Sequence, residues 1–160
     1  MTRTWVVRTA EEMRDLGARL GERCKPGDVI VLSGDLGAGK TTIAQGIGRG
    51  MGIEESITSP TFVIARVHPN PADGPDLVHV DAYRLGTLSE VEDLDLDSDL
   101  ANSVVVVEWG DGLVDGLSHS RVVVRIVRTD DESDETRHVA MSADGGRWTT
   151  ALDELSQATP

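Results

Sequence analysis

The sequence predicts an α/β fold in which a mixed central β-sheet is flanked by helices, and three patterns support this prediction. Residues 28–33 have the composition of a strand and lead through a glycine-rich loop into a helical pattern over about 40–51. Residues 104–107 are consecutive valines, typical of a strand that is covered on both faces in the middle of a sheet. Residues 121–128 alternate in part, and 136–142 could return beside them as a hairpin.

The amino-terminal segment is expected to form a short strand and then a helix. Trp5-Val6-Val7 is the strand candidate. Thr9 and Glu12 have capping-box spacing, and apolar residues follow at helical intervals, which predicts a helix from about 10 to 24. Pro26-Gly27 then turns the chain toward the strand over 28–33.

The helix predicted over about 40–51 contains an unusual number of glycines. Gly46, Gly48 and Gly50 should each cost about 1 kcal/mol relative to alanine. We therefore expect close packing against a neighbouring element to compensate for this cost.

The rest of the chain contains shorter elements and turns. The expected segments are an extended stretch over 57–67, a loop over 68–76, a strand over 77–80, a short acidic helix over 89–94 and a polar, acidic turn over 129–135. The chain has 160 residues, enough for one domain. We assign this domain to residues 1–148 and expect 149–160 to be a weakly ordered tail.

Composition excludes several classes of function. The formal net charge of −13 argues against direct binding of nucleic acid, because phosphate backbones are gripped by basic patches. The single cysteine, Cys24, cannot form an intrachain disulfide and is expected to be a small core residue. No stretch resembles a membrane span or a signal peptide, so we expect a cytoplasmic protein without membrane contact.

Residues 34–41 form a complete G-x-x-x-x-G-K-[ST] phosphate loop between a predicted strand and a predicted helix. The loop amides of Asp35, Leu36, Gly37, Ala38 and Gly39 are expected to face phosphate oxygens, at the positive end of the helix dipole. Lys40 would reach the β and γ phosphates, Thr41 would bind Mg²⁺, and Thr42 could add a phosphate contact. The context predicts a single P-loop NTPase domain that binds a nucleoside triphosphate.

A phosphate loop needs a second carboxylate for Mg²⁺, and such acids commonly follow a buried apolar strand. Glu108 follows the valine run and meets this description. Asp81 follows another apolar strand, where it could orient the attacking water or bind the metal through water. His79 would leave the same face of that strand as Asp81, although a structural role is the commoner one for a histidine there. Thr61, in Ser59-Pro60-Thr61, could sense the γ-phosphate or Mg²⁺ as part of a switch segment.

Four sequence blocks in order resemble the TsaE family, also called YjeE. They are Gly-Asp-Leu-Gly-Ala-Gly-Lys-Thr-Thr (34–42), Thr-Ser-Pro-Thr-Phe (58–62), His-Val-Asp-Ala-Tyr-Arg-Leu (79–85) and Val-Glu-Trp (107–109). The resemblance implies an ATPase of the bacterial pathway that attaches threonylcarbamoyl to a tRNA adenosine beside the anticodon. It also implies docking on the TsaB and TsaD proteins, with ATP hydrolysis supporting turnover of the complex and TsaD performing the transfer.

The resemblance also implies roles for individual residues. Lys40 and the loop amides would hold phosphates, and Thr41 and Glu108 would serve Mg²⁺. Thr61 would belong to the switch, and Asp81 lies in the family's essential acidic motif. Glu11 and Arg137 are the nearest candidates for nucleotide contacts from the first helix and from the carboxyl-terminal hairpin. Roles for His79, Tyr83, Arg84 and Trp109 do not follow from the sequence.

Three other functions are compatible with a phosphate loop to different degrees. A small-molecule kinase would need an acceptor site and arginines over the transferred phosphoryl group. Arg84 is one candidate for such an arginine, but the sequence shows no lid rich in arginine. A GTPase would need a guanine-reading Asn-Lys-x-Asp segment, which is missing. A nucleotide-sensing module with little turnover stays open, because the acidic surface suits protein docking.

Overall fold

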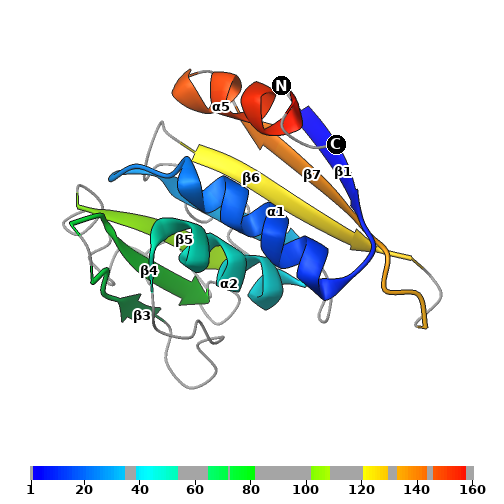
Figure 1. Cartoon of the computed structure of the whole chain (residues 1–160), viewed down its shortest axis with the longest axis horizontal. Coiled ribbons are helices and arrows are strands. Elements are labelled where there is room, and N and C mark those ends of the chain that lie inside the picture. Colours follow the sequence, from blue (N-terminus) through cyan, green and yellow to red (C-terminus); the bar gives the residue numbers. More distant parts are fainter. Residues whose placement is uncertain are drawn as a thin grey trace.

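The computed structural model describes residues 2–34, 39–53, 65–71, 73–81, 102–108, 121–129, 133–143 and 146–157. Its elements along the chain are β1 (Thr2–Val7), α1 (Ala10–Glu22), β2 (Val29–Gly34), α2 (Lys40–Met51), β3 (Ala65–His68), β4 (Asp76–Asp81), β5 (Ser103–Glu108), β6 (Arg121–Arg128), β7 (Arg137–Ala143) and α5 (Gly146–Gln157) (Figure 1). The predicted helix over 89–94, most of the extended stretch over 57–67 and part of the 129–135 turn lie outside the described residues.

The seven strands form one mixed sheet in the order β1-β7-β6-β2-β5-β4-β3. Strands β6, β2, β5 and β4 run parallel to their neighbours in this central group. The outer pairs β1–β7, β6–β7 and β3–β4 are antiparallel. This arrangement confirms the predicted mixed sheet, the central position of the valine strand and the hairpin formed by β6 and β7.

Helices α1, α2 and α5 lie on one face of the sheet (Figure 1). Alternate side chains of the strands meet them there, because successive residues of a strand point to opposite faces. The resulting core includes Leu16, Leu20, Ile43 and Ile47 from the helices and Ile30, Leu32, Val104, Val106, Val124 and Met141 from the strands. The sheet therefore presents one continuous apolar face to the helices.

Helices α1 and α2 are in backbone contact through their glycines. A Cβ atom at Gly46 would lie 2.2 Å from the carbonyl oxygen of Arg14, and one at Gly50 would lie 2.0 Å from that of Ala18. In the other direction, a Cβ atom at Gly21 would lie 2.2 Å from the carbonyl oxygen of Ile47. The expected close packing is thus confirmed for Gly46 and Gly50. It also holds the start of α1 beside the start of α2.

The carboxyl-terminal residues differ from the weakly ordered tail predicted from 149. Helix α5 continues to Gln157 and buries Trp148, Ala151, Leu152 and Leu155 against the sheet. Arg147 donates a hydrogen bond to the carbonyl oxygen of Arg23 at 2.9 Å and pairs with the buried carboxylate of Asp28. In the sequence, polar residues separate the apolar positions of this amphipathic helix, so the pattern was not recognised. The apolar side chains are buried because α5 packs on β1 and β7 in the folded protein.

Other boundaries differ from the sequence predictions by one to three residues; β1, for example, begins at Thr2 rather than at Trp5. Helix α1 ends at Glu22 with Arg23 as its C-cap, rather than continuing to 24. His68 and Asp76, predicted in a loop, are the last residue of β3 and the first residue of β4. Helix ends are set by cap hydrogen bonds, here from the backbone N–H of Arg23, and such bonds are weakly encoded in composition.

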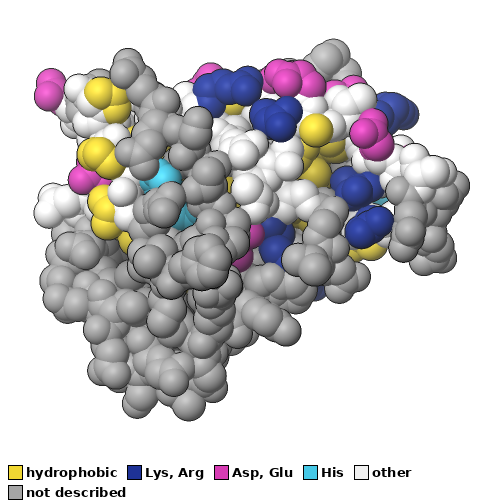
Figure 2. Space-filling view, turned by 90° about the horizontal axis from the view of Figure 1, so that it is seen from below, with side chains coloured by type: hydrophobic (Ala, Val, Ile, Leu, Met, Phe, Trp, Pro, Cys, Tyr) yellow, Lys and Arg dark blue, Asp and Glu magenta, His cyan; other side chains and the backbone are white. Residues whose placement is uncertain are grey.

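Acidic and basic side chains lie close together on the described part of the surface in Figure 2. Glu11 pairs with Arg14 at 3.5 Å and with Arg49 at 3.7 Å; the Glu11 and Arg49 side chains are exposed, and that of Arg14 is partly buried. Exposed pairs of this kind contribute little stability, about 0–1 kcal/mol each. None of the helices in the described part of the chain has the length and hydrophobicity of a membrane-spanning helix.

Candidate nucleotide-binding site

The phosphate loop leaves the sheet at the end of β2 and enters α2. Strand β2 ends at Gly34, and Gly39 is the N-cap of α2 with a φ of 118°. This is the left-handed region, where glycine has no Cβ penalty. The backbone N–H of Ile43 donates to the carbonyl oxygen of Gly39 at 2.9 Å, which begins the helical hydrogen bonding. Residues 35–38, predicted to contact phosphate, lie outside the described residues.

Lys40 is the first residue of α2, and its side chain turns back toward β2. Its Nζ atom donates a hydrogen bond to the carbonyl oxygen of Gly34 at 2.6 Å, and the residue is buried. A buried ammonium beside the amino terminus of a helix creates a strongly positive site. Thr41 and Thr42 follow in the first turn of the helix. The arrangement suits an anion at the position predicted from the sequence.

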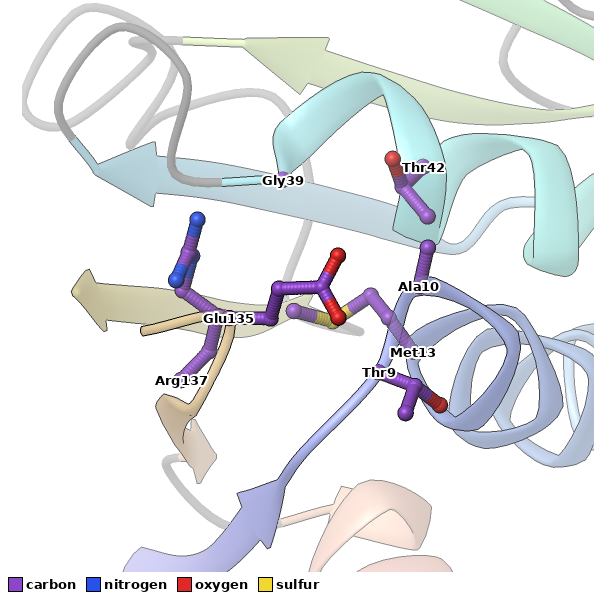
Figure 3. A pocket seen from close by; sticks show the side chains of 7 residues that line it. All are labelled: Thr9, Ala10, Met13, Gly39, Thr42, Glu135 and Arg137. Atoms are coloured by element: carbon purple, nitrogen blue, oxygen red, sulfur yellow. The ribbon is translucent and has the colours of Figure 1, made fainter. Parts of the chain in front are cut away.

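A pocket of about 120 Å³ adjoins the start of α2 (Figure 3). It is lined by Thr9, Ala10, Met13, Gly39, Thr42, Glu135 and Arg137. These residues come from the start of α1, the start of α2 and the segment leading into β7. In Figure 3 the Arg137 side chain extends toward the segment at Gly39, and the Glu135 carboxylate points into the space between the helices and the hairpin.

The structure brings Arg137, but not Glu11, to this pocket. Arg137 lines it and donates hydrogen bonds to the carbonyl oxygens of Asp134 and Thr136, at 3.0 Å and 3.1 Å. Glu11 does not line it and instead forms the surface pairs with Arg14 and Arg49. From the start of α1, the lining residues are Thr9, Ala10 and Met13. A direct nucleotide contact by Glu11 stays a prediction.

Two acids end neighbouring parallel strands beside the loop. In the sheet register Glu108 of β5 is paired with Leu32 of β2 on one side and with Asp81 of β4 on the other. Leu32 lies two residues before Gly34, where the phosphate loop begins. Both predicted strand-end acids therefore lie at the carboxyl edge of the central strands, which is the usual ligand edge of an α/β sheet.

Glu108 and His79 form a buried pair at this edge. Nε2 of His79 lies 2.8 Å from Oε2 of Glu108, and both side chains are at least nine-tenths buried. Although this is an ion-pair distance, neither atom makes an aligned hydrogen bond within the described part of the chain. The Glu108 carboxylate is thus held in the protein interior with capacity to accept a further contact.

Several predicted functional residues cannot be compared with this geometry. Thr61, Tyr83, Arg84 and Trp109 lie outside the described residues, and for Asp81 the structure defines the backbone position only. Within the described ranges, no cluster of three or more histidine, cysteine or acidic side chains could by itself hold a metal ion.

Sequence reasoning missed part of this site. The pocket residues Ala10, Met13 and Glu135 had no signal beyond helix and turn patterns. The contact between His79 and Glu108 was also missed, although both residues belong to strands predicted to share one sheet. One signal for this contact was available in the sequence. Asp81 and Glu108 both end apolar strands, and His79 lies two residues before Asp81 on the same strand face.

Comparison with known proteins identifies relatives over nearly the whole chain. Residues 7–139 match the family model described as threonylcarbamoyl adenosine biosynthesis protein TsaE. A Streptomyces coelicolor protein named tRNA threonylcarbamoyladenosine biosynthesis protein TsaE is 57% identical over 141 residues, which is 87% of this chain and 95% of that protein. A Bacillus subtilis protein of the same name is 36% identical, over 96% of this chain and 93% of its own length.

A solved structure supports the same assignment. The crystal structure of YdiB from Bacillus subtilis superposes with a TM-score of 0.79 at 31% identity, over 100% of this chain and 97% of that one. The fold is that of a P-loop NTPase, with the phosphate loop between β2 and α2 at the carboxyl edge of the sheet. From the family match, the sequence identities and the shared fold, the chain belongs to the TsaE family.

Proposed function

We propose that this protein is a Mg²⁺-dependent ATPase that supports the threonylcarbamoylation of tRNA. One observation carries the proposal: the buried cation of Lys40 and the buried carboxylate of Glu108 lie at the same edge of adjacent parallel strands, beside the phosphate loop. A phosphoryl-transfer site requires both a cation for phosphate oxygens and a carboxylate for Mg²⁺.

The residues present fit a magnesium site. Glu108 carries a buried oxygen atom, Oε2, that accepts no hydrogen bond from the described residues. Carboxylate and hydroxyl oxygens are suitable ligands for Mg²⁺, which usually keeps several waters and also binds substrate phosphates. Glu108 and Thr41 are therefore the residues that would hold it. When bound, Mg²⁺ would neutralise charge on the β and γ phosphates.

The remaining roles follow from position. Lys40 and the amides of 35–39 would bind the phosphates, with Thr42 adding a contact. Asp81, beside Glu108 in the register, would orient the attacking water. Thr61 would report the γ-phosphate as part of the switch. Arg137, in the pocket beside α2, would contact the nucleotide.

The pathway and partners are inferred from the family. The relatives are named for tRNA threonylcarbamoyladenosine biosynthesis. We propose that ATP orders the segment 58–62 and creates a face that docks on TsaB and TsaD, and that hydrolysis then releases it. The net charge of −13 favours contact with the tRNA through these partners rather than directly. We expect these events to take place in the cytoplasm.

ATP hydrolysis by the purified protein with Mg²⁺ tests the proposal, measured alone, with TsaB and TsaD from the same source, and with tRNA omitted or added. Stimulation of hydrolysis by the two proteins, together with ATP-dependent complex formation, is the expected result. Phosphate transfer to a small acceptor without response to TsaB and TsaD would favour a kinase. ATP-dependent docking without turnover would favour a nucleotide sensor.

A further inference from the structure

The buried contact between His79 and Glu108 suggests a role for a residue that the proposed function leaves unused. Strands β4 and β5 are parallel, and their register pairs His79 with Val106 and Asp81 with Glu108. His79 thus lies one row before the carboxyl edge, and its Nε2 atom reaches diagonally to Oε2 of Glu108, 2.8 Å away. Both side chains lie on the sheet face that α1 and α2 cover.

Burial makes this contact important for the geometry of Glu108. An isolated carboxylate is expensive to bury, so its orientation depends strongly on the few polar groups that it meets. His79, on β4, is fully buried as well. Within the part of the chain that the structure describes, the polar contact at Oε2 of Glu108 is the one from Nε2 of His79.

From this geometry we propose that His79 is a positioning residue for Glu108. Its imidazole, 2.8 Å from Oε2, limits the orientations open to the buried carboxylate, which is thereby held at the carboxyl edge of the sheet where Mg²⁺ would bind. This inference rests on the proposed Mg²⁺-dependent nucleotide binding. Groups that orient a metal-binding carboxylate typically change metal affinity by about 10- to 100-fold when they are removed.

The proposal distinguishes the two ring nitrogens of His79. A glutamine amide nitrogen can occupy nearly the same position as Nε2, whereas an asparagine amide reaches only as far as Nδ1. His79→Gln should therefore keep most of the Mg²⁺ affinity, and His79→Asn should lose it, as should the apolar variant His79→Leu. A purely structural role for a buried histidine does not predict this order.

The experiment is a titration of a fluorescent ATP analogue over a series of Mg²⁺ concentrations, with a matched series in EDTA. For His79→Asn and His79→Leu the half-saturating Mg²⁺ concentration should rise about 10-fold, while binding in EDTA stays unchanged. His68→Gln is the matched control, because His68 is equally buried but is paired with Leu77, near the other end of β4. Thermal unfolding of each variant identifies any that do not fold.

A double-mutant cycle tests whether His79 acts through Glu108. In a Glu108→Gln background, His79→Asn should cause no further change in Mg²⁺ dependence, since coupled residues are not additive. The positioning role would be wrong, and the proposed function would stand, if wild type and His79→Asn had the same Mg²⁺ dependence. The same would follow if His79→Asn lost as much binding in EDTA as it loses with Mg²⁺. Nucleotide binding by the wild type that ignores Mg²⁺ would overturn both this role and the proposed function.

Discussion

Lys40 and Gly34 tie the two ends of the phosphate loop together. Nζ of Lys40, at the start of α2, donates to the carbonyl oxygen of Gly34, at the end of β2, at 2.6 Å. The side chain that is expected to hold the β and γ phosphates therefore also closes the loop. Its position depends on the packing of α2 against α1, since this packing fixes the start of the helix.

Lys40→Ala removes this closing contact together with the cation. Hydrogen bonds to charged groups contribute about 1.5–3 kcal/mol, so ATP affinity should fall by roughly 10- to 100-fold. Equilibrium titration with ATP measures the change. Lys25→Ala is the control, because Lys25 is the other lysine of the chain and lies in the turn after α1. Full ATP affinity in Lys40→Ala would mean that the loop is not the nucleotide site.

Asp81→Ala should keep ATP binding and lose turnover. A residue that orients water contributes to the transition state rather than to binding, and general-base groups supply about 10²- to 10⁴-fold in rate. Single-turnover hydrolysis and ATP binding should be measured on the same preparation. Asp76→Asn, at the other end of β4, provides the comparison. Unchanged hydrolysis in Asp81→Ala would refute the assignment.

Gly46→Ala should destabilise the protein. The added Cβ would lie 2.2 Å from the carbonyl oxygen of Arg14, so α1 and α2 would have to separate. Overpacking of this kind costs about 1–3 kcal/mol; because the clash is with backbone, the cost should lie toward the upper end and exceed the gain of about 1 kcal/mol in helix propensity. Urea unfolding gives the free energy. Thr150→Ala, at an exposed position of α5, should show no such loss.

Arg147→Met should loosen α5 by leaving the buried carboxylate of Asp28 without its ion-pair partner. Removing one partner of a fully buried pair costs about 3–5 kcal/mol, and a smaller loss is expected here because the Arg147 side chain is 32% exposed and Asp28 also accepts a hydrogen bond from the backbone N–H of Lys25. The additional substitution Asp28→Asn should recover part of the stability. Thermal unfolding that is unaffected by Arg147→Met would argue against this anchor.

Cys24 should react slowly with thiol reagents while the protein is folded. Burial raises the pKa of its thiol from 9.0 to about 12, while the nearby Arg147 lowers it in part. The thiolate is therefore scarce at pH 8, and alkylation should become fast only in denaturant. Because the folded pKa exceeds the unfolded one, this contribution to stability is complete below pH 9 and is lost as pH rises toward 12. Rapid native alkylation at pH 8 would contradict this.

Much of the fold was predictable because its signals are local. The capping-box spacing of Thr9 and Glu12 located the start of α1, and the Thr9 side chain does accept a hydrogen bond from the backbone N–H of Glu12 at 3.1 Å. The valine run located β5, and the alternation over 121–128 located β6 with its bounds. Helix α5 was missed because its burial depends on β1, at the opposite end of the sequence, and on the pairing of β1 with the neighbouring strand β7.

The sequence by itself determined the phosphate loop, the order of the described elements from β1 to β7 and the two acids at the ends of β4 and β5, since each depends on neighbouring residues and their backbone preferences. Only the tertiary structure decided that Arg137, rather than Glu11, lines the pocket beside α2, and that His79 meets Glu108. These contacts join segments that are distant in the chain. They depend on strand order and side-chain packing, whose free energies belong to the folded molecule as a whole.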